Sequence, residues 1–309
     1  MRHLFLLNPR AGKYDRTQEV REKIRFALAG REEPWEAAVT QNPGHAAELA
    51  RAAAETGEAV RIYACGGDGT LNECAVGAAG FANAAVTHYP MGSGNDFLRM
   101  FGPDAPRFYD LKELLDAPQA PMDLIDCNGH LALNVCSVGF DARIGLGAGD
   151  FKGLPLVSGT MAYQLSAVRA ILQGIHRPYR VSIDGEELPG SEFTLMCACN
   201  GRYYGGGFNP SRTAMPDDGL LDFVVIPAVS RLTVVSLIGK YAKGGAGDIE
   251  GVVVRRGREM HVVCDRVSRI NLDGEEMLDS ELSVTVSAKK VNFFYPAGTH
   301  WDPAQRSKT

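Results

Sequence analysis

The sequence predicts an α/β protein of two domains, in which a parallel α/β domain is followed by a mostly antiparallel β-sandwich domain. Strand-like and helix-like patterns alternate over the first part of the chain, which is typical of a parallel sheet. After about Pro121, short strand-like runs dominate, and turn signals such as Asp184-Gly185 separate several of them. The length of 309 residues exceeds that of a usual single domain. We therefore expect residues 1–125 to form the first domain, residues 126–289 to form the second, and residues 290–309 to return to the first.

Periodicity defines the elements of the first domain. Apolar residues at helical spacing alternate with short apolar runs, and turn residues follow the strands. The predicted strands are residues 3–8, Trp35 to Val39, Val60 to Ala64 and Ala85 to Tyr89, and the predicted helices are Arg16 to Leu28, Gly44 to Glu55 and a helix after Thr70.

The second domain is predicted from shorter strand-like runs, interrupted by two helical stretches. The runs are Leu131 to Ser137, Tyr179 to Ile183, Phe193 to Asn200, Leu221 to Ile226, Gly251 to Val254, Met260 to Val263, Arg269 to Leu272 and Leu282 to Val286. The helical stretches are Thr160 to Leu172 and Arg231 to Tyr241, and Val291 to Tyr295 is predicted as a last strand of the first domain.

Composition excludes several classes of protein. Hydrophobic residues make up 45% and charged residues 22%, as in ordinary globular proteins, and the net charge of −5 argues against a nucleic-acid partner. The apolar run from Leu4 to Leu7 is too short for a signal peptide or a spanning helix. Seven dispersed cysteines without CxxC spacing indicate reduced thiols rather than a zinc site. We expect a cytoplasmic protein.

A glycine turn dominates the first domain. Ala59 to Glu73 reads AVRIYACGGDGTLNE, which predicts a strand, a turn with three glycines around Asp68, and a helix. Glycines let backbone N–H groups approach phosphate oxygens, with the positive end of the helix behind them. A carboxylate in such a turn repels phosphate unless a divalent cation lies between them. The turn therefore predicts Mg²⁺–nucleotide binding, although glycine loops at strand–helix junctions are also common without a ligand.

Other motifs are ordinary when taken singly. Met91 to Phe97, MGSGNDF, repeats the pattern of glycines, a hydroxyl and a carboxylate near a helix start, but it also fits a plain helix cap. Met215 to Leu221, MPDDGLL, has the composition of a turn, and Asp273-Gly274-Glu275 that of a hairpin. Neither GxGxxG nor GxxxxGK[ST] follows the first strand, which argues against a dinucleotide-binding dehydrogenase and a Walker-type ATPase.

Taken together, these motifs resemble the diacylglycerol kinase catalytic domain family, and more closely its soluble bacterial lipid kinases. NPRAGK, GGDGTLNE, GSGNDF, NGRYYGGGFNPSRTAMPDDGLLD and DGE occur in this order over nearly the whole chain. The resemblance implies a Rossmann-like nucleotide domain, a β-sandwich domain for the lipid substrate, and an active site in the cleft between them. Ser93 keeps the hydroxyl of a position that is often Thr in bacterial relatives, but GSGN also resembles sphingosine and ceramide kinases.

The resemblance also implies roles for individual residues. Asp68, Asp96 and Asp123 would organise a catalytic Mg²⁺, partly through water, and Glu275 would accept the proton. A second, structural Mg²⁺ would bind Asp218 and the backbone carbonyls of Met215 and Leu220. The residues implied in nucleotide binding are Asn8, Pro9, Gly12, Lys13, Thr40, Gly66, Gly67, Asp68, Gly69, Thr70, Leu71, Asn72, Glu73, Ser93, Asn95 and Asp96.

The function implied is transfer of the γ-phosphoryl group of ATP to a lipid hydroxyl, with diacylglycerol as acceptor and phosphatidic acid as product. The alternatives are a kinase for a sphingoid base, phosphatidylglycerol or NAD, and a non-catalytic nucleotide-binding regulator. We expect peripheral contact with a membrane surface, where the apolar stretch Gly153 to Leu172 or two arginine clusters could touch headgroups. The same features equally fit a core helix and solvated strand edges. A homodimer is an open expectation. The clusters are His176, Arg177 and Arg180, and Arg255, Arg256 and Arg258.

Overall fold

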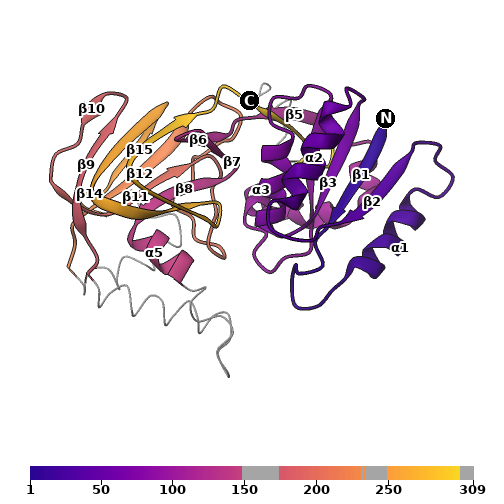
Figure 1. Ribbon diagram of the computed structural model, residues 1–309, viewed down its shortest axis with the longest axis horizontal. Coiled ribbons are helices and arrows are strands. Elements are labelled where there is room, and N and C mark those ends of the chain that lie inside the picture. Colours follow the sequence, from indigo (N-terminus) through magenta and orange to yellow (C-terminus); the bar gives the residue numbers. More distant parts are fainter. Residues whose placement is uncertain (148–173, 231–232, 234–248, 300–309) are drawn as a thin grey trace. The chain divides into compact units, whose positions relative to one another are not determined.

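The computed structural model describes residues 1–147, 174–230, 233 and 249–299, and its chain divides into two compact units (Figure 1). The first unit comprises Met1–Asp123 with Ala288–Thr309, and the second comprises Leu124–Ser287. The stretch predicted as a helix at Thr160 to Leu172 lies outside the described residues, as does all of Arg231 to Tyr241 except Thr233.

The first unit is built on a six-stranded sheet with the order β2-β1-β3-β4-β16-β5. The first five strands in this order run parallel, and only β5 is antiparallel to its neighbour. The parallel α/β prediction is therefore confirmed. The strands are β1 (Arg2–Leu7), β2 (Trp35–Val39), β3 (Val60–Gly66), β4 (Ala84–Pro90), β5 (Gln119–Met122) and β16 (Val291–Phe294).

Helices cover both faces of this sheet, with α2 and α3 on one side and α1 on the other (Figure 1). In α1 the buried residues Thr17, Val20 and Ile24 recur at helical spacing, which gives the helix one apolar face for the sheet. The helices are α1 (Thr17–Ala27), α2 (His45–Glu55), α3 (Asp68–Gly77), the 3₁₀ segment η1 (Phe97–Tyr109) and α4 (Leu111–Leu115).

The order of the strands creates a switch point between β1 and β3. The chain leaves β1 toward β2 through α1, and it then crosses back to β3 through α2 on the opposite face. The loops after β1 and β3 consequently diverge to opposite faces at the carboxyl edge of the sheet. In open α/β sheets, ligands bind at this position.

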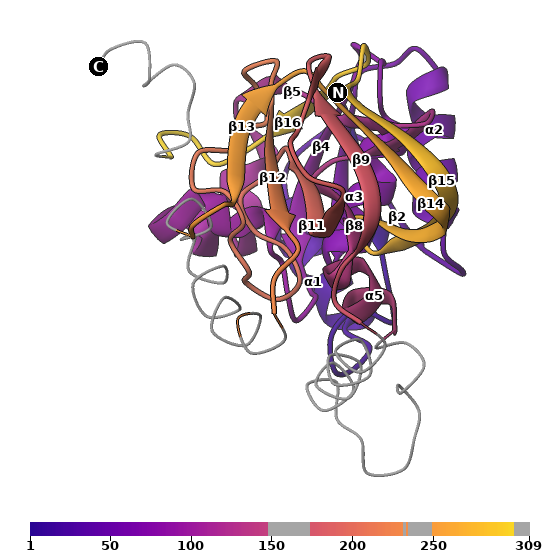
Figure 2. The same cartoon turned by 90° about the vertical axis from the view of Figure 1, so that its left-hand side faces the viewer.

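The second unit is antiparallel in every pairing of its described strands. Its sheet is branched, because β11 pairs with β8, β9 and β12, while β14 pairs with β8, β9 and β15. Figure 2 shows β13, β12 and β11 as neighbouring strands of this sheet, and β14 beside β15. The elements are β6 (Ile125–Cys127), β7 (His130–Ala132), β8 (Val135–Gly139), α5 (Phe140–Gly147), β9 (Arg177–Ile183), β10 (Glu186–Glu187), β11 (Glu192–Cys199), β12 (Leu221–Pro227), β13 (Val253–Gly257), β14 (Glu259–Leu272) and β15 (Glu275–Val286).

Two strand predictions in the second unit are wrong. Leu131 to Ser137 is not one strand, because the Asp273 carboxylate accepts the N–H groups of Leu133, Asn134 and Val135 and separates β7 from β8. The runs predicted as separate strands before and after Cys264 are one strand, β14, whose pairing with β15 shifts register between Val263 and Ser268.

The described residues of the second unit form two apolar clusters. The larger one includes Phe223, Met196 and Val262, and the smaller one includes Leu195, Cys197 and Val224. All seven cysteines of the chain are buried and none forms a disulfide. Among the described residues, no helix is both long enough and apolar enough to cross a membrane.

Helices α2 and α3 pack so closely that there is no room for a side chain at position 77, which is a glycine. A Cβ at Gly77 would lie 2.3 Å from the Ala47 carbonyl oxygen and 2.9 Å from the Ala50 Cβ. We expect Gly77→Ala to lower the free energy of unfolding by about 1–3 kcal/mol, because overpacking outweighs the helix propensity gained. Denaturant unfolding measures the change. Gly69→Ala is the matched control, since a Cβ there meets nothing within 4 Å. Equal losses in the two variants would contradict the packing argument.

Candidate functional site

Three loops of the first unit meet at the carboxyl edge of its sheet. The loop after β1 contacts the first turn of α3, which follows β3, because Asn8 Nδ2 donates to Thr70 Oγ1 at 2.9 Å. The loop after β1 also contacts the loop after β4, since a Cβ on Gly12 would lie 2.6 Å from the Met91 carbonyl oxygen. These loops and the first two turns of α3 contain most of the residues predicted to bind nucleotide, and they include the switch point between β1 and β3.

The glycines of the second and third loops are in backbone contact. The Gly66 carbonyl accepts the N–H of Met91 at 2.7 Å and that of Gly92 at 3.0 Å. A Cβ on Gly92 would lie 2.6 Å from the Gly67 Cα, so no larger residue fits at Gly92 without moving a loop. The backbone of both loops is therefore fixed at close range.

Asp68 begins α3 at the centre of these loops. Its Oδ1 accepts the backbone N–H of Phe97 at 3.1 Å. Burial raises the pKa of the Asp68 carboxyl above its usual value, and backbone hydrogen bonds from Phe97, Asp96 and Asn95 oppose that rise. Asp68 is half-buried, and a carboxylate whose loss of water is only partly offset by hydrogen bonds favours a nearby positive charge.

Asp68 and Asp96 face the same space, where Gly94 has no side chain. A Cβ on Gly94 would lie 2.9 Å from Asp68 Oδ2 and 3.7 Å from Asp96 Oδ2. Asn95 Oδ1 is buried and has no hydrogen-bond partner among the described residues. Asp96 Oδ1 accepts a hydrogen bond from Arg99 Nε at 2.9 Å, and Asp96 Oδ2 is the oxygen nearer to Gly94. Carboxylate and amide oxygens are the protein ligands suited to Mg²⁺, which keeps several of its waters, so Oδ2 of each aspartate fits the predicted ion.

The third predicted carboxylate, Asp123, has a different neighbour. It is fully buried, and its Oδ1 lies 2.8 Å from Lys290 Nζ on the returning C-terminal segment. No group of three or more His, Cys, Asp or Glu side chains that could hold a metal occurs in the described part of the chain. A direct site made of Asp68, Asp96 and Asp123 is therefore not formed, and any joint role requires bridging water.

Several other predicted nucleotide residues have structural partners. Glu73 Oε2 accepts the N–H of Ala46 at 3.0 Å, and so holds the start of α2. Leu71 is buried within α3. The Thr40 N–H donates to the Leu7 carbonyl at 2.9 Å, which places Thr40 directly after β2 and beside the end of β1. The remaining residues of that set are placed as follows: Lys13 lies against the Tyr14 ring, Pro9 is half-buried, Asn72 is buried, and Gly69 and Ser93 are exposed.

Glu275 lies in the second unit and is exposed at the start of β15. It follows a tight turn in which Asp273 and Gly274 have φ values of 51° and 95°. The hairpin reading of this motif is therefore correct, and it is compatible with a functional Glu275. The three N–H groups held by Asp273 tie the turn to the start of β8, as described above.

The turn predicted to hold a structural Mg²⁺ also lies in the second unit. Asp218 Oδ1 accepts the N–H of Leu220 at 3.0 Å, and Asp218 Oδ2 forms an ion pair with Arg256. Both carboxylate oxygens are thus already engaged within the chain.

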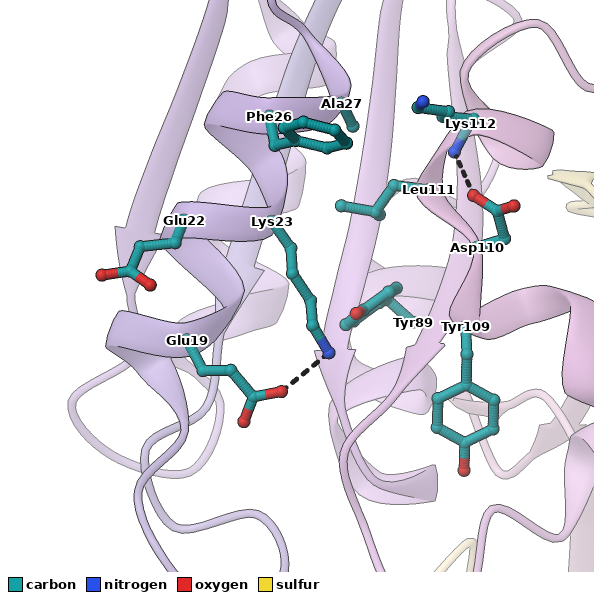
Figure 3. Close-up of a pocket in the computed structure, with 10 residues that line it drawn as sticks. All are labelled: Glu19, Glu22, Lys23, Phe26, Ala27, Tyr89, Tyr109, Asp110, Leu111 and Lys112. Atoms are coloured by element: carbon teal, nitrogen blue, oxygen red, sulfur yellow. Dashed lines mark hydrogen bonds and ion pairs between the residues drawn. The ribbon is translucent and has the colours of Figure 1, made fainter.

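A cavity of about 540 Å³ lies elsewhere in the first unit, between α1, the end of β4 and the start of α4 (Figure 3). The ammonium of Lys23 points to Glu19 at 2.7 Å, and the buried hydroxyl of Tyr89 has no hydrogen-bond partner among the described residues. None of the residues predicted to bind nucleotide lines this cavity. The lining residues are Glu19, Glu22, Lys23, Phe26, Ala27, Tyr89, Tyr109, Asp110, Leu111 and Lys112.

Sequence reasoning missed several residues of the candidate site. Gly92 and Gly94 belong to the MGSGNDF motif that the sequence analysis singled out, but neither glycine was given a role of its own. The pairing of Lys290 with Asp123 was not predicted, nor was the contact of Asp273 with Leu133 to Val135, because each joins segments far apart in the sequence.

Comparison with known proteins agrees with this architecture. Residues 2–127 match the "Diacylglycerol kinase catalytic domain", and residues 134–295 match the "YegS C-terminal NAD kinase beta sandwich-like domain". The chain is 32% identical over 283 residues to the "Probable lipid kinase YegS-like" of Pseudomonas aeruginosa strain PAO1, covering 90% of this chain and 91% of that protein. It is 33% identical over 279 residues to the protein of the same name from Pseudomonas fluorescens strain Pf-5, covering 87% and 89%.

A solved structure shows the same fold. The crystal structure of a diacylglycerol kinase from Bacillus anthracis str. Sterne matches with a TM-score of 0.71 at 21% identity, covering 98% of this chain and 97% of that one. The matches to both family domains and the identity to full-length relatives lead to one conclusion. The chain belongs to the family of YegS-like lipid kinases that carry the diacylglycerol kinase catalytic domain.

Proposed function

We propose that the protein uses ATP and Mg²⁺ to phosphorylate a lipid hydroxyl, with diacylglycerol as acceptor and phosphatidic acid as product. The observation that carries the proposal is the pair of carboxylates, Asp68 and Asp96, that face Gly94 among the loops after β1, β3 and β4. Membership in the lipid kinase family supports the reaction class.

In this proposal the first unit binds the nucleotide phosphates. The backbone of Gly67, Gly69 and Gly92 offers close approach, and the N-terminus of α3 favours negative charge there. Bound Mg²⁺ would neutralise phosphate charge during a transfer in which positioning and electrostatics are the main contributions. Asp68 and Asp96 would hold the ion, and Asp123, kept in place by Lys290, would act on it through water.

Glu275 is proposed as the general base that takes the proton from the lipid hydroxyl. It is exposed, and the turn before it is fixed by the Asp273 carboxylate, which limits how far the glutamate can move. General-base catalysis by one positioned side chain is worth about 10²–10⁴-fold in rate.

A panel of acceptors tests the function. Labelled ATP is incubated with vesicles that contain diacylglycerol, phosphatidylglycerol or sphingosine, and separately with NAD, and the products are separated. We expect labelled phosphatidic acid, and a loss of at least about 10²-fold in rate for Asp68→Asn. Cosedimentation with the same vesicles measures the proposed peripheral contact. Label in another product would identify another acceptor, whereas nucleotide binding without turnover of any acceptor would contradict the kinase proposal.

Asp68→Asn is also expected to stabilise the protein at neutral pH. Burial raises the pKa of the Asp68 carboxyl in the folded state, so the ionised carboxylate lowers stability at pH values above that pKa. This loss of stability disappears as the pH falls through the folded-state pKa toward the pKa of about 3.9 in the unfolded chain. The gain in Tm over wild type should therefore be present at pH 7 and shrink toward pH 4.

Asp15→Asn provides the control of opposite sign. The Thr17 N–H donates to Asp15 Oδ1 at 2.8 Å and lowers the pKa of the Asp15 carboxyl, so its loss should lower Tm at pH 7. A lower Tm for Asp68→Asn at pH 7 would contradict the account of Asp68.

Glu275→Gln should reduce kcat by about 10²–10⁴-fold, with little change in the KM for ATP, because only proton transfer is affected. Glu276→Gln is the matched control, since Glu276 is the next residue on β15 and pairs with Arg269 at 2.9 Å. Steady-state kinetics measures both variants. A similar kcat for Glu275→Gln and wild type would assign the base to another group.

A further inference from the structure

The turn before β12 is held by guanidinium groups at both of its ends. Arg256 lies on β13 directly opposite Asp222 of β12 in the antiparallel register. Its Nη2 forms an ion pair with Asp218, and its Nε donates to Asp222 Oδ1 at 3.0 Å. A single positive charge therefore bridges two of the three carboxylates of the MPDDGLLD segment, those of Asp218 and Asp222.

The carboxylate of Asp222 requires the positive charge of Arg256. It is 1% exposed, and its Oδ2 accepts hydrogen bonds from Ser211 Oγ and from Thr213 Oγ1, the latter at 2.6 Å. These two hydroxyl groups donate hydrogen bonds to the carboxylate, but they carry no positive charge to balance it. A buried carboxylate needs a cation as well as hydrogen bonds, and Arg256 is that cation.

Arg202 adds a second positive charge at the other end of the turn. Its Nε donates to the Ala214 carbonyl at 3.0 Å, and its Nη2 lies 2.9 Å from Met215 Sδ. A divalent ion coordinated by the Met215 carbonyl and Asp218 would lie among two guanidinium groups, which raises the electrostatic cost of binding it.

The donors that the family resemblance assigns to a structural Mg²⁺ therefore do not fit that ion in this chain. Asp218 has one oxygen on the Leu220 N–H and the other on Arg256. We propose that Arg256 takes the place of the metal: its guanidinium supplies the positive charge that the turn requires, and the turn binds no divalent cation. The stability of the second unit is then independent of Mg²⁺.

Thermal unfolding and Mn²⁺ binding test this proposal on the full chain. The background is Asp68→Asn, so that the candidate nucleotide site does not contribute to metal binding. In that background we expect the same Tm in EDTA and in MgCl₂ at matched ionic strength. Electron paramagnetic resonance should show no bound Mn²⁺ that depends on Asp218, so a further Asp218→Asn change should leave the Mn²⁺ signal unaltered. A Mg²⁺-dependent rise in Tm, or bound Mn²⁺, that Asp218→Asn abolishes would overturn the proposal.

Removing the arginine should expose the latent site. Arg256→Gln in the same background should have a lower Tm in EDTA, bind Mn²⁺ at least about tenfold more tightly, and recover part of its Tm in Mg²⁺. Arg255→Gln is the matched control, because Arg255 is the preceding residue of β13 and pairs with the exposed Glu186 instead. No gain of Mn²⁺ binding in Arg256→Gln would overturn the claim that arginine substitutes for a metal. Both readouts are independent of catalysis, so they stand apart from the lipid kinase proposal.

Discussion

The contact between the backbones of Gly67 and Gly92 is the constraint on which the candidate site depends. It lets the loops after β3 and β4 approach until Gly66 accepts two N–H groups from the neighbouring loop. That approach lets the carboxylates of Asp68 and Asp96 face the same space beside Gly94. Side chains at these glycines would separate the loops, and the carboxylates would then be solvated surface groups. The chemistry of the site thus follows from the absence of side chains at a few positions.

Much of the fold of the first unit and of its candidate site could be predicted from the sequence. Short apolar runs alternate with apolar residues at helical spacing, and this pattern predicts the parallel sheet. The glycines around Asp68 predict the turn. Both predictions depend on residues close together in the chain. Interactions between distant segments were not accessible. Asp273 divides one apolar run into β7 and β8, and Lys290 pairs with Asp123. In both cases the sequence around the contacted residue does not indicate that its distant partner will be there.

The turn before β12 shows the same limit in another form. The letters MPDDGLLD carry the family resemblance, and they imply a metal. The residue that changes this interpretation, Arg256, comes from the neighbouring strand and is visible only once the register of β12 and β13 is known. A motif specifies which donors a turn can offer. The strand beside it determines which cation they receive.

The first unit is discontinuous in the chain, and this has a consequence for its synthesis. β16 lies between β4 and β5 in the sheet, and it is made only after the whole second unit. While the chain is still emerging from the ribosome, β5 has no neighbour, β4 presents an open edge, and the buried Asp123 lacks its lysine. Domains that are contiguous in sequence can fold in order from the N-terminus. Here the first unit to be translated is the last that can be completed, so a nascent chain displays the open edge of β4 until β16 has been made.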